Sequence, residues 1–354
     1  MNNPVGIIVV GCGNMGGSHA RAYQQLSGFE ILGLVSRNPE SRERLSEELG
    51  GVPTFAGLPE ALQNTSATAV SINTYPDSHG QLVRAALENE CHVFVEKPLA
   101  LTVEEASGLV ELASRKNLKL VVGYILRVHP AWALFVKEAR SLGKPLVMRM
   151  NLNQQSSGPQ WYTHKQLMKS MSPIVDCGVH YVDIMCMMTG SRPVSVSAIG
   201  ARLSDDISPE MYNYGQLQVR FEDGSVGWYE AGWGPMMSET AFFIKDVIGP
   251  KGSVSISDAP AGSSDNIEEH TRTGLLRKHH SKLSPSGNFF LEDELIRIEN
   301  EPDHDGLCLL EQEYFLSAIV QDIDLTAHLR DAVNSLQIVL AADASVRTGK
   351  TIIL

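Results

Sequence analysis

Near its N-terminus the chain reads Val5-Gly6-Ile7-Ile8-Val9-Val10-Gly11-Cys12-Gly13-Asn14-Met15-Gly16. Val5–Val10 is a short apolar run rich in β-branched residues, which is the pattern of a buried strand. Glycines follow at once, and Met15–Leu26 then has the pattern of a helix. The stretch therefore predicts a strand, a glycine-rich turn and a helix, which is the opening unit of an α/β fold.

The alternation of strand and helix continues to about residue 122. Four further apolar runs predict strands, at Glu30–Val35, Ala69–Ile72, His92–Val95 and Leu118–Val122. Helical stretches lie between them, at Pro39–Leu49, Asp77–Glu90 and Thr102–Lys116. We expect Asp77 to cap its helix, and Thr102 to cap the next helix with Glu105 three residues on. Such alternation predicts parallel βαβ units in a doubly wound, Rossmann-type sheet.

The alternation of strands and helices ends at about residue 125. Longer strand-like stretches follow with few helices between them, at Leu146–Gln154, Val194–Leu203, Tyr214–Glu222, Ser225–Gly232 and Ala241–Ile248. Phe221–Ser225 is typical of a hairpin turn. Residues 258–304 are expected to form loops and short strands, and two helices to follow near Gly306–Gln321 and His328–Thr348. We therefore divide the chain into an α/β domain, residues 1–125, and an α+β domain with an antiparallel sheet, residues 126–354.

Composition narrows the class of protein. The chain has 354 residues and a formal net charge of −12, which disfavours nucleic acid as a partner. Its five cysteines form no CxxC pair, so we expect no disulfide framework, no cysteine zinc site and a reducing compartment. No leader-like segment and no apolar run of roughly 18 residues is present, so we expect no membrane span and a cytoplasmic protein.

The glycine turn fits the pattern G-x-G-x-x-G. Gly11 would make the tight turn, Gly13 would let the backbone approach a pyrophosphate, and Gly16 would let helix and strand pack closely. Asn14 and Met15 would add the N–H groups of the helix N-terminus, which favour phosphate. The turn therefore predicts a bound nicotinamide dinucleotide; an unliganded glycine turn is the alternative.

The residues after the second strand bear on which dinucleotide binds. A carboxylate that binds the ribose of NAD usually lies roughly 20 residues past the glycines. The chain has Ser36 and Arg37 at that point. A guanidinium can hold a 2′-phosphate with two hydrogen bonds, so this pair favours NADP(H), with NAD(H) possible. Arg37 as a solvated loop charge is the alternative.

Further motifs, in order along the chain, resemble the Gfo/Idh/MocA family, the glucose–fructose oxidoreductase and inositol dehydrogenase group. Glu96-Lys97-Pro98 follows a predicted strand at the ligand-binding edge of the sheet. The other matching stretches are Thr74–His79, with Tyr75 where proline is usual, Gly123–Pro130, Asp176–Asp183, which fits D-x-G-x-H-x-x-D, and Ser335–Lys350. Ser172-Pro173-Ile174-Val175 departs from the family, which often has glycines there, and this leaves the substrate open.

The resemblance implies a nucleotide-binding domain followed by a domain with an open, mostly antiparallel sheet for substrate binding and oligomerisation. It implies an NAD(P)-dependent oxidoreductase that interconverts a secondary alcohol and a ketone on a sugar, sugar derivative or cyclic polyol. Thr74, Tyr75, His79, Glu96, Lys97 and Arg127 would lie at the cofactor. A homodimer or homotetramer is expected.

The same resemblance assigns the chemistry. His180 would be the general acid/base, Asp176 would orient the substrate or relay the proton, and Lys97 would stabilise the developing alkoxide. Asp176 and His180 stand four residues apart and would share one face of a helix. With Asp183 they would also suit a metal ion, but the resemblance implies members without metal, so we expect none.

Three residues are assigned to the substrate with alternatives open. Trp161 and Tyr162 would stack on a sugar ring or serve only in packing. Arg127 would reach substrate or cofactor. Two other functions also remain open: a nucleotide-binding regulatory sensor without turnover, and a reductase of a non-sugar substrate.

Overall fold

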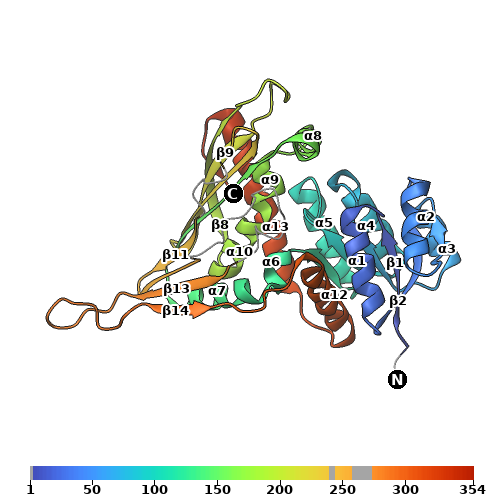
Figure 1. Ribbon diagram of the computed structural model, residues 1–354, viewed down its shortest axis with the longest axis horizontal. Coiled ribbons are helices and arrows are strands. Elements are labelled where there is room, and N and C mark those ends of the chain that lie inside the picture. The colour runs from blue at the N-terminus through green and yellow to red at the C-terminus, as the bar shows by residue number, and fades with distance from the viewer. Residues whose placement is uncertain (1–2, 239–243, 257–272) are drawn as a thin grey trace. The chain divides into compact units, whose positions relative to one another are not determined.

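The computed structural model describes residues 3–238, 244–256 and 273–354, which form two compact units (Figure 1). The first unit comprises the chain up to Val128 together with Pro302–Val333. The second comprises His129–Glu301 and Asn334–Leu354. Each unit has its own sheet, so each is described by itself.

The first unit contains a six-stranded parallel sheet. Its order is β3-β2-β1-β4-β5-β6, with bounds Thr54–Phe55 (β3), Phe29–Val35 (β2), Val5–Val10 (β1), Ala69–Ile72 (β4), His92–Glu96 (β5) and Leu120–Gly123 (β6). The predicted doubly wound sheet is confirmed. The order reverses between β1 and β4, and ligands of open α/β sheets bind outside the carboxyl ends of the strands at such a point.

Helices connect these strands. They are α1 (Asn14–Gln25), α2 (Pro39–Glu48), α3 (Leu58–Asn64), the short 3₁₀ helix η1 (Pro76–Ser78), α4 (His79–Glu88), α5 (Val103–Arg115) and α6 (Ile125–Val128). Thr102 caps α5 as predicted, since its side chain accepts the N–H of Glu105. Asp77 does not cap α4: it lies inside η1, because Pro76 starts a 3₁₀ turn and α4 begins only at His79.

Residues 302–333 pack with the first unit, whereas the sequence analysis placed them in the second domain. Here α12 (His304–Val320) lies against α1. The Tyr23 hydroxyl donates to Gln312 Oε1 at 2.6 Å, and the buried Phe315 ring stacks on Phe29 at 5.9 Å. Burial of these aromatic side chains holds α12 on the first unit, and a pattern read along the chain carries no information about such a distant contact.

The second unit contains a nine-stranded sheet in the order β14-β13-β12-β11-β7-β10-β9-β8-β15. The bounds are β7 Val147–Gln155, β8 Pro193–Ala201, β9 Tyr214–Phe221, β10 Val226–Gly234, β11 Lys245–Gly249, β12 Gly252–Ile256, β13 Leu275–His280, β14 Glu294–Arg297 and β15 Ile352–Ile353. The expected mostly antiparallel sheet is confirmed, with β7 and β10 as a parallel pair at its centre. The predicted hairpin turn joins β9 and β10, where Gly224 has a φ of 84°.

Helices pack on the second sheet. They are α7 (Pro130–Ser141), α8 (Gly158–Leu167), α9 (Pro173–Asp176) and α10 (Gly178–Thr189), joined by the second half of α13 (Thr326–Thr348). The expected pair of C-terminal helices corresponds to α12 and α13. The expected strand from Ala241 begins outside the described residues. The first part of the predicted loop region, residues 258–272, also lies outside them, and the described remainder, residues 273–304, holds β13 and β14.

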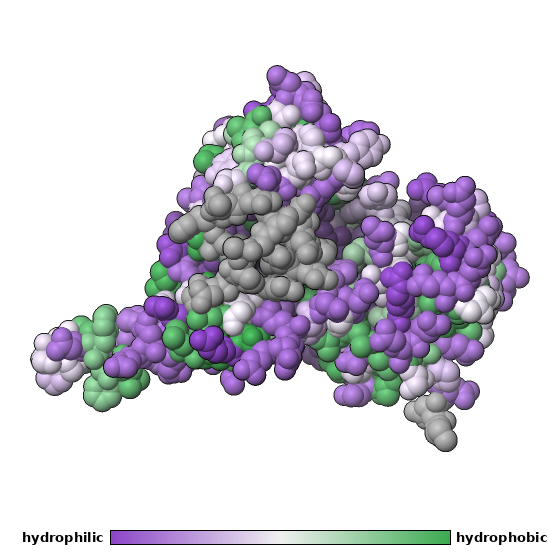
Figure 2. Space-filling model, in the orientation of Figure 1, coloured by the Kyte–Doolittle hydropathy of each residue, from purple (hydrophilic) through white to green (hydrophobic). Residues whose placement is uncertain are grey.

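Figure 1 shows the β13–β14 hairpin running out from the end of the second sheet. Its tip is held by an isolated bridge between Leu283 and Phe289. Five large apolar side chains on the hairpin are strongly exposed, and Figure 2 shows apolar surface there: Leu283, Phe289, Phe290, Leu291 and Leu295.

Candidate functional site

The glycine turn lies at the carboxyl end of β1, beside the order reversal of the first sheet. Gly11 has a φ of 95°, and a Cβ there would lie 2.5 Å from the carbonyl oxygen of Asn73. A Cβ on Gly16 would lie 1.7 Å from the oxygen of Gly11. Both positions therefore exclude any side chain: Gly11 because the turn is tight, and Gly16 because the helix packs close to the turn.

Gly13 differs from these two glycines. A Cβ at Gly13 would meet no atom of the described residues within 4 Å, so no neighbour among them explains the absence of a side chain. Gly13 is also the N-cap of α1, and the exposed Asn14 and partly exposed Met15 follow it. Open space over a helix N-terminus suits a pyrophosphate, so these residues fit a dinucleotide.

Ser36 and Arg37 lie directly after β2, where the sequence placed them. Arg37 is exposed, and the Ser36 hydroxyl accepts the N–H of Asn38 at 3.2 Å. The structure adds Arg42, which the sequence analysis missed: its Nη1 donates to the oxygen of Ser36 at 2.8 Å. Two arginines thus accompany Ser36, because α2 returns Arg42 to the end of β2.

The Glu96-Lys97 segment is held by buried groups. Glu96 Oε1 lies 2.8 Å from His19 Nε2 on α1, and Glu96 Oε2 accepts the N–H of Lys97 at 3.3 Å. His79 Nδ1 lies 2.7 Å from the oxygen of Pro98, and its Nε2 lies 3.0 Å from that of Thr74. Burial lowers the pKa of His79, against the two carbonyl contacts that raise it. His79 and Glu96 therefore position the loop, while Lys97 is partly exposed.

The remaining residues expected at the cofactor differ in exposure. Thr74 is partly exposed and shares a hydrogen bond of 2.7 Å between its Oγ1 and Ser78 Oγ. Tyr75 is 69% exposed. The Arg127 side chain is mostly buried, its Nη2 3.1 Å from Asp331 Oδ2 within the first unit. Arg127 thus joins α6 to α13.

In the second unit, Asp176 and His180 stand on a polar stripe. Residues 171–189 are almost wholly buried; the partly exposed ones are Asp176, Cys177, His180 and Met187. The two predicted residues do not share one continuous helix, because α9 ends at Asp176 and α10 begins at Gly178. Cys177 joins the helices with a φ of −86° and a ψ of −39°, which keeps the chain near the α conformation.

Side chains that sequence reasoning missed support this stripe. Cys177 Sγ donates to Gln154 Oε1 at 3.3 Å and lies 3.6 Å from Asp176 Oδ2. The same Gln154 oxygen accepts Trp233 Nε1–H at 2.6 Å. Gln154 and Trp233 lie on the neighbouring strands β7 and β10, so the sheet fixes the bend between the helices. A Cβ on Gly178 would lie 2.8 Å from the Tyr229 ring, which explains the glycine.

The two aromatic residues expected at the substrate are placed differently. Trp161 is 9% exposed and packs in an apolar cluster with Met168, Ile207 and Trp233. Tyr162 is 62% exposed. The structure thus favours packing for the Trp161 ring and leaves the Tyr162 ring accessible.

Ser172, which stands where the family often has glycine, begins α9. Its hydroxyl accepts the N–H of Val175 at 3.2 Å and donates to Asp343 Oδ1 at 2.7 Å. The departure from the family pattern therefore has a local structural explanation in helix capping.

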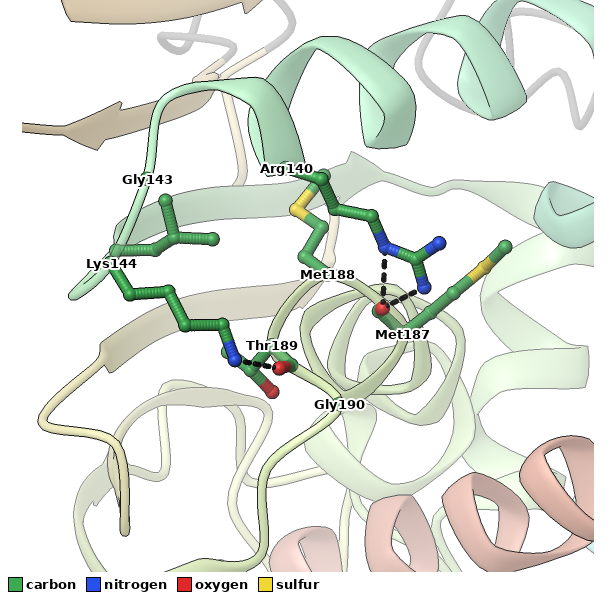
Figure 3. Close-up of a pocket in the computed structure, with 8 residues that line it drawn as sticks. Arg140, Gly143, Lys144, Met187, Met188, Thr189 and Gly190 are labelled. Carbon is green, nitrogen blue, oxygen red and sulfur yellow. Dashed lines mark hydrogen bonds between the residues drawn. The ribbon is translucent and has the colours of Figure 1, made fainter. Parts of the chain in front are cut away.

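A pocket of about 320 Å³ lies at the opposite end of α10 from His180 (Figure 3). Arg140 Nε donates to the oxygen of Met187 at 3.2 Å, and Lys144 Nζ bonds the oxygen of Thr189. Cations at the carbonyl end of a helix stabilise its dipole, so these side chains cap α10. The pocket is thus separate from the polar stripe.

The first unit has a parallel sheet with an open glycine turn where the strand order reverses. The second unit has a sheet with a polar stripe on its helices. Together these features define a two-domain dinucleotide-binding protein. Residues 5–124 match the model of the oxidoreductase family with an NAD-binding Rossmann fold, and residues 136–255 match the GFO/IDH/MocA C-terminal domain. The chain belongs to the Gfo/Idh/MocA oxidoreductase family.

Known proteins resemble the chain over part or nearly all of its length. A scyllo-inositol 2-dehydrogenase (NAD(+)) of Bacillus subtilis (strain 168) is 28% identical over 369 residues, covering 99% of this chain and 96% of the relative. A UDP-N-acetylglucosamine 3-dehydrogenase of Acidithiobacillus ferrooxidans is 30% identical over 198 residues, 56% of this chain and 58% of the relative. GenD2 from gentamicin A biosynthesis, solved with NAD, has the same fold, with a TM-score of 0.79, 20% identity and coverage of 100% and 97%.

Among the described residues, no helix combines the length and the apolar character needed to cross a bilayer.

Proposed function

We propose that the protein is an NAD(P)-dependent oxidoreductase that interconverts a secondary alcohol and a ketone on a cyclic polyol or sugar. The observation that carries the proposal is the polar stripe of Asp176 and His180 on otherwise buried helices, in a chain whose glycine turn leaves space over Gly13. Buried helices rarely keep an acid and an imidazole partly exposed without a function for them.

The substrate class follows from the relatives. Their names assign alcohol dehydrogenation to an inositol and to a sugar nucleotide. Both substrates carry secondary hydroxyl groups on a six-membered ring, so we propose a ring hydroxyl as the reacting group. Tyr162, which is exposed, is the aromatic residue that remains available to stack on such a ring.

The roles of the chain's own residues follow from their chemistry. His180 takes the hydroxyl proton, and Asp176 orients the substrate or relays that proton. Lys97 stabilises negative charge on the reacting oxygen. The nicotinamide, when bound, accepts the hydride. Glu96 and His79 are positioning residues that hold the loop carrying Lys97. We assign cofactor binding to the first unit, and substrate binding and oligomerisation to the second.

We further propose a preference for NADP(H). Ser36 and Arg37 supply no carboxylate to repel a 2′-phosphate, and Arg42 adds a second guanidinium beside Ser36. Arg37→Ala should raise the Kd for NADPH roughly tenfold or more, with a small effect on NADH, since it removes a charge-assisted contact to the extra phosphate. Arg44→Ala is the matched control on α2. Equal losses for both cofactors would contradict the preference.

The function is tested by reduced-nicotinamide absorbance with inositols, free sugars and sugar nucleotides, each with NAD⁺ and NADP⁺. The proposal expects turnover with at least one ring alcohol, and its loss in Lys97→Ala. Tight nucleotide binding without turnover of any ring alcohol or ketone would favour a regulatory sensor. Turnover of a non-sugar ketone alone would favour a reductase of a non-sugar substrate.

We also propose a homodimer or homotetramer in a cytoplasmic, reducing compartment. The exposed apolar side chains of the β13–β14 hairpin, such as Phe289 and Phe290, support the oligomer because large exposed apolar patches mark interaction surfaces. The five cysteines, an odd number with no CxxC pair among them, support the compartment. Light scattering should give a dimer or tetramer mass that Phe289→Asp lowers; a monomeric wild type would contradict the oligomer.

A further inference from the structure

A buried cluster of metal-ligating side chains lies in the first unit, and it adjoins Glu96 through His19. One nitrogen of His19, the Cys308 thiol and a carboxylate oxygen of Glu311 lie within 4.8 Å of one another. All three side chains are buried, with 0%, 0% and 3% of their residue surface exposed. Burial on this scale is unusual for a glutamate.

Two of these groups, Cys308 and Glu311, lie with His304 in a stripe on one face of the helix α12. His304, Cys308 and Glu311 stand at positions i, i+4 and i+7, which share a face of a helix. Cys308 Sγ lies 3.7 Å from His304 Nε2, and His304 is only partly buried. His304 therefore stands at the outer end of the stripe, where a ligand would enter.

One carboxyl oxygen of Glu311 lacks a partner. This atom, Oε1, has no hydrogen-bond partner among the residues that the structure describes. A buried carboxylate oxygen without a partner is costly, so either a proton or a cation must occupy this place.

We propose that His19, Cys308 and Glu311 bind a zinc ion. A mixed set of nitrogen, sulfur and carboxylate oxygen suits Zn²⁺ and disfavours Mg²⁺ or Ca²⁺, which prefer oxygen alone. A cation would neutralise the Glu311 carboxylate and favour the thiolate of Cys308.

The surroundings of His19 support this inference. A metal on Nε2 requires Nδ1–H to donate to an acceptor, and Gln312 lies 2.8 Å from Nδ1. Rotation of the Gln312 amide by a half turn would present its oxygen to Nδ1–H and its NH₂ to the Tyr23 hydroxyl, which now donates to it. Both partners of the amide tolerate the exchange, so one rotation completes the outer shell.

The ion would join segments far apart in the chain. His19 lies on α1, and the other two ligands lie on α12. The site would therefore fasten α12 to α1.

The experiment uses the full chain, freed of metal by a chelator, without nucleotide and with a non-thiol reductant. Co²⁺ is the probe, because a cobalt–thiolate bond gives a charge-transfer band in the near ultraviolet and a tetrahedral site gives visible bands. We expect one Co²⁺ per chain with both signals, displacement by Zn²⁺, and a higher thermal midpoint with Zn²⁺.

Two variants and one control identify the ligands. Cys308→Ser should abolish the charge-transfer band, and Glu311→Gln should weaken Co²⁺ binding at least tenfold. Cys91→Ser, which alters another buried cysteine of the first unit, should leave both signals unchanged. Absence of the thiolate band in the wild type would overturn the proposal, and a proton rather than a cation would then occupy the place beside Glu311. A band that persists in Cys308→Ser would also overturn it, because Cys308 would not be the ligand.

Discussion

The glycine turn of the first unit and the polar stripe of the second are built by different means. At the turn, the backbone and the lack of side chains make the site: a Cβ at Gly11 or Gly16 would overlap the backbone, and one at Gly13 would enter open space. On the stripe, side chains make the site, and other side chains from β7 and β10 hold them.

This difference explains which site can be read from sequence. A backbone site is encoded by local spacing, so three glycines after a strand suffice to predict it. A side-chain site depends on contacts between segments far apart in the chain, such as that of Cys177 with Gln154. Local spacing therefore predicts only those side chains of the site that a motif contains. The following substitutions test this contrast, in order of decreasing expected effect.

His180→Ala should give the largest effect. Loss of a general acid/base lowers kcat by about 10²–10⁴-fold, with nucleotide binding and folding retained. The measurement is steady-state turnover of the best ring alcohol. His279→Ala, on the exposed β13–β14 hairpin, is the matched control and should keep full activity. Retained turnover in His180→Ala would refute the assigned mechanism.

Gly16→Ala and Gly13→Ala should separate folding from binding at the glycine turn. The Gly16 Cβ would lie 1.7 Å from a carbonyl oxygen, so we expect a loss of about 3 kcal/mol or more in unfolding free energy. Gly13→Ala should keep wild-type stability but weaken nucleotide binding about tenfold. Urea unfolding and nucleotide titration measure the two effects. A Gly13→Ala variant with wild-type affinity would show that the pyrophosphate does not approach this residue.

Gln154→Leu should affect the second unit moderately. It leaves the buried Trp233 Nε1–H and the Cys177 thiol without their shared acceptor, which costs about 1–3 kcal/mol of unfolding free energy. Because the Asp176 bend loses support, kcat should fall more than nucleotide affinity. Gln216→Leu on β9, a partly exposed site, is the control. If Gln154→Leu weakens nucleotide binding instead, the stripe is not confined to substrate chemistry.

His328→Gln should give the smallest effect, seen in the pH dependence of stability. His328 Nε2 accepts the N–H of Val122 at 3.0 Å, and burial holds the pKa of His328 well below its usual 6.5. The unfolded chain therefore takes up a proton that the folded chain does not, so stability falls as pH drops below 6.5, by up to about 1.4 kcal/mol per pH unit.

Glutamine keeps an acceptor for Val122 but does not titrate, so the variant should lose less stability on acidification. Urea unfolding between neutral pH and about pH 5 measures the slope. An unchanged slope would show that His328 does not contribute to the pH dependence of stability. The other buried histidines with lowered pKa, His79 and His129, would then account for that dependence.

Much of the fold was predictable because its signals are local. Val5–Val10 and Ala69–Ile72 agree with β1 and β4 residue for residue, and Thr102 caps α5 as expected. Short elements were missed, since β3 has two residues and no apolar run marks it. The packing of α12 on the first unit depends on the hydrogen bond from Tyr23 of α1 to Gln312 and on the contact of Phe315 with Phe29 of β2, which no local pattern contains.

Sequence motifs point to the residues that we propose to be reactive but not to the residues that support them. Asp176, His180 and Lys97 stand out through motifs, whereas Arg42, Gln154 and Cys177 gain their significance only from contacts in the folded chain. His79 and Glu96 were expected at the cofactor, and their bonds to Pro98 and His19 show how they also hold the loop. The spacing of His304, Cys308 and Glu311 is a signal that a search for helical stripes would have found.

The most direct test of the central claim is isotope transfer. A ring alcohol that the enzyme turns over is prepared with deuterium on the reacting carbon, and the reduced nicotinamide is examined by mass spectrometry. The account predicts that the cofactor carries the deuterium in the wild type and that His180→Ala slows this transfer. An oxidised product with no label on the cofactor would contradict it, as would nucleotide binding without label transfer for every ring alcohol tried.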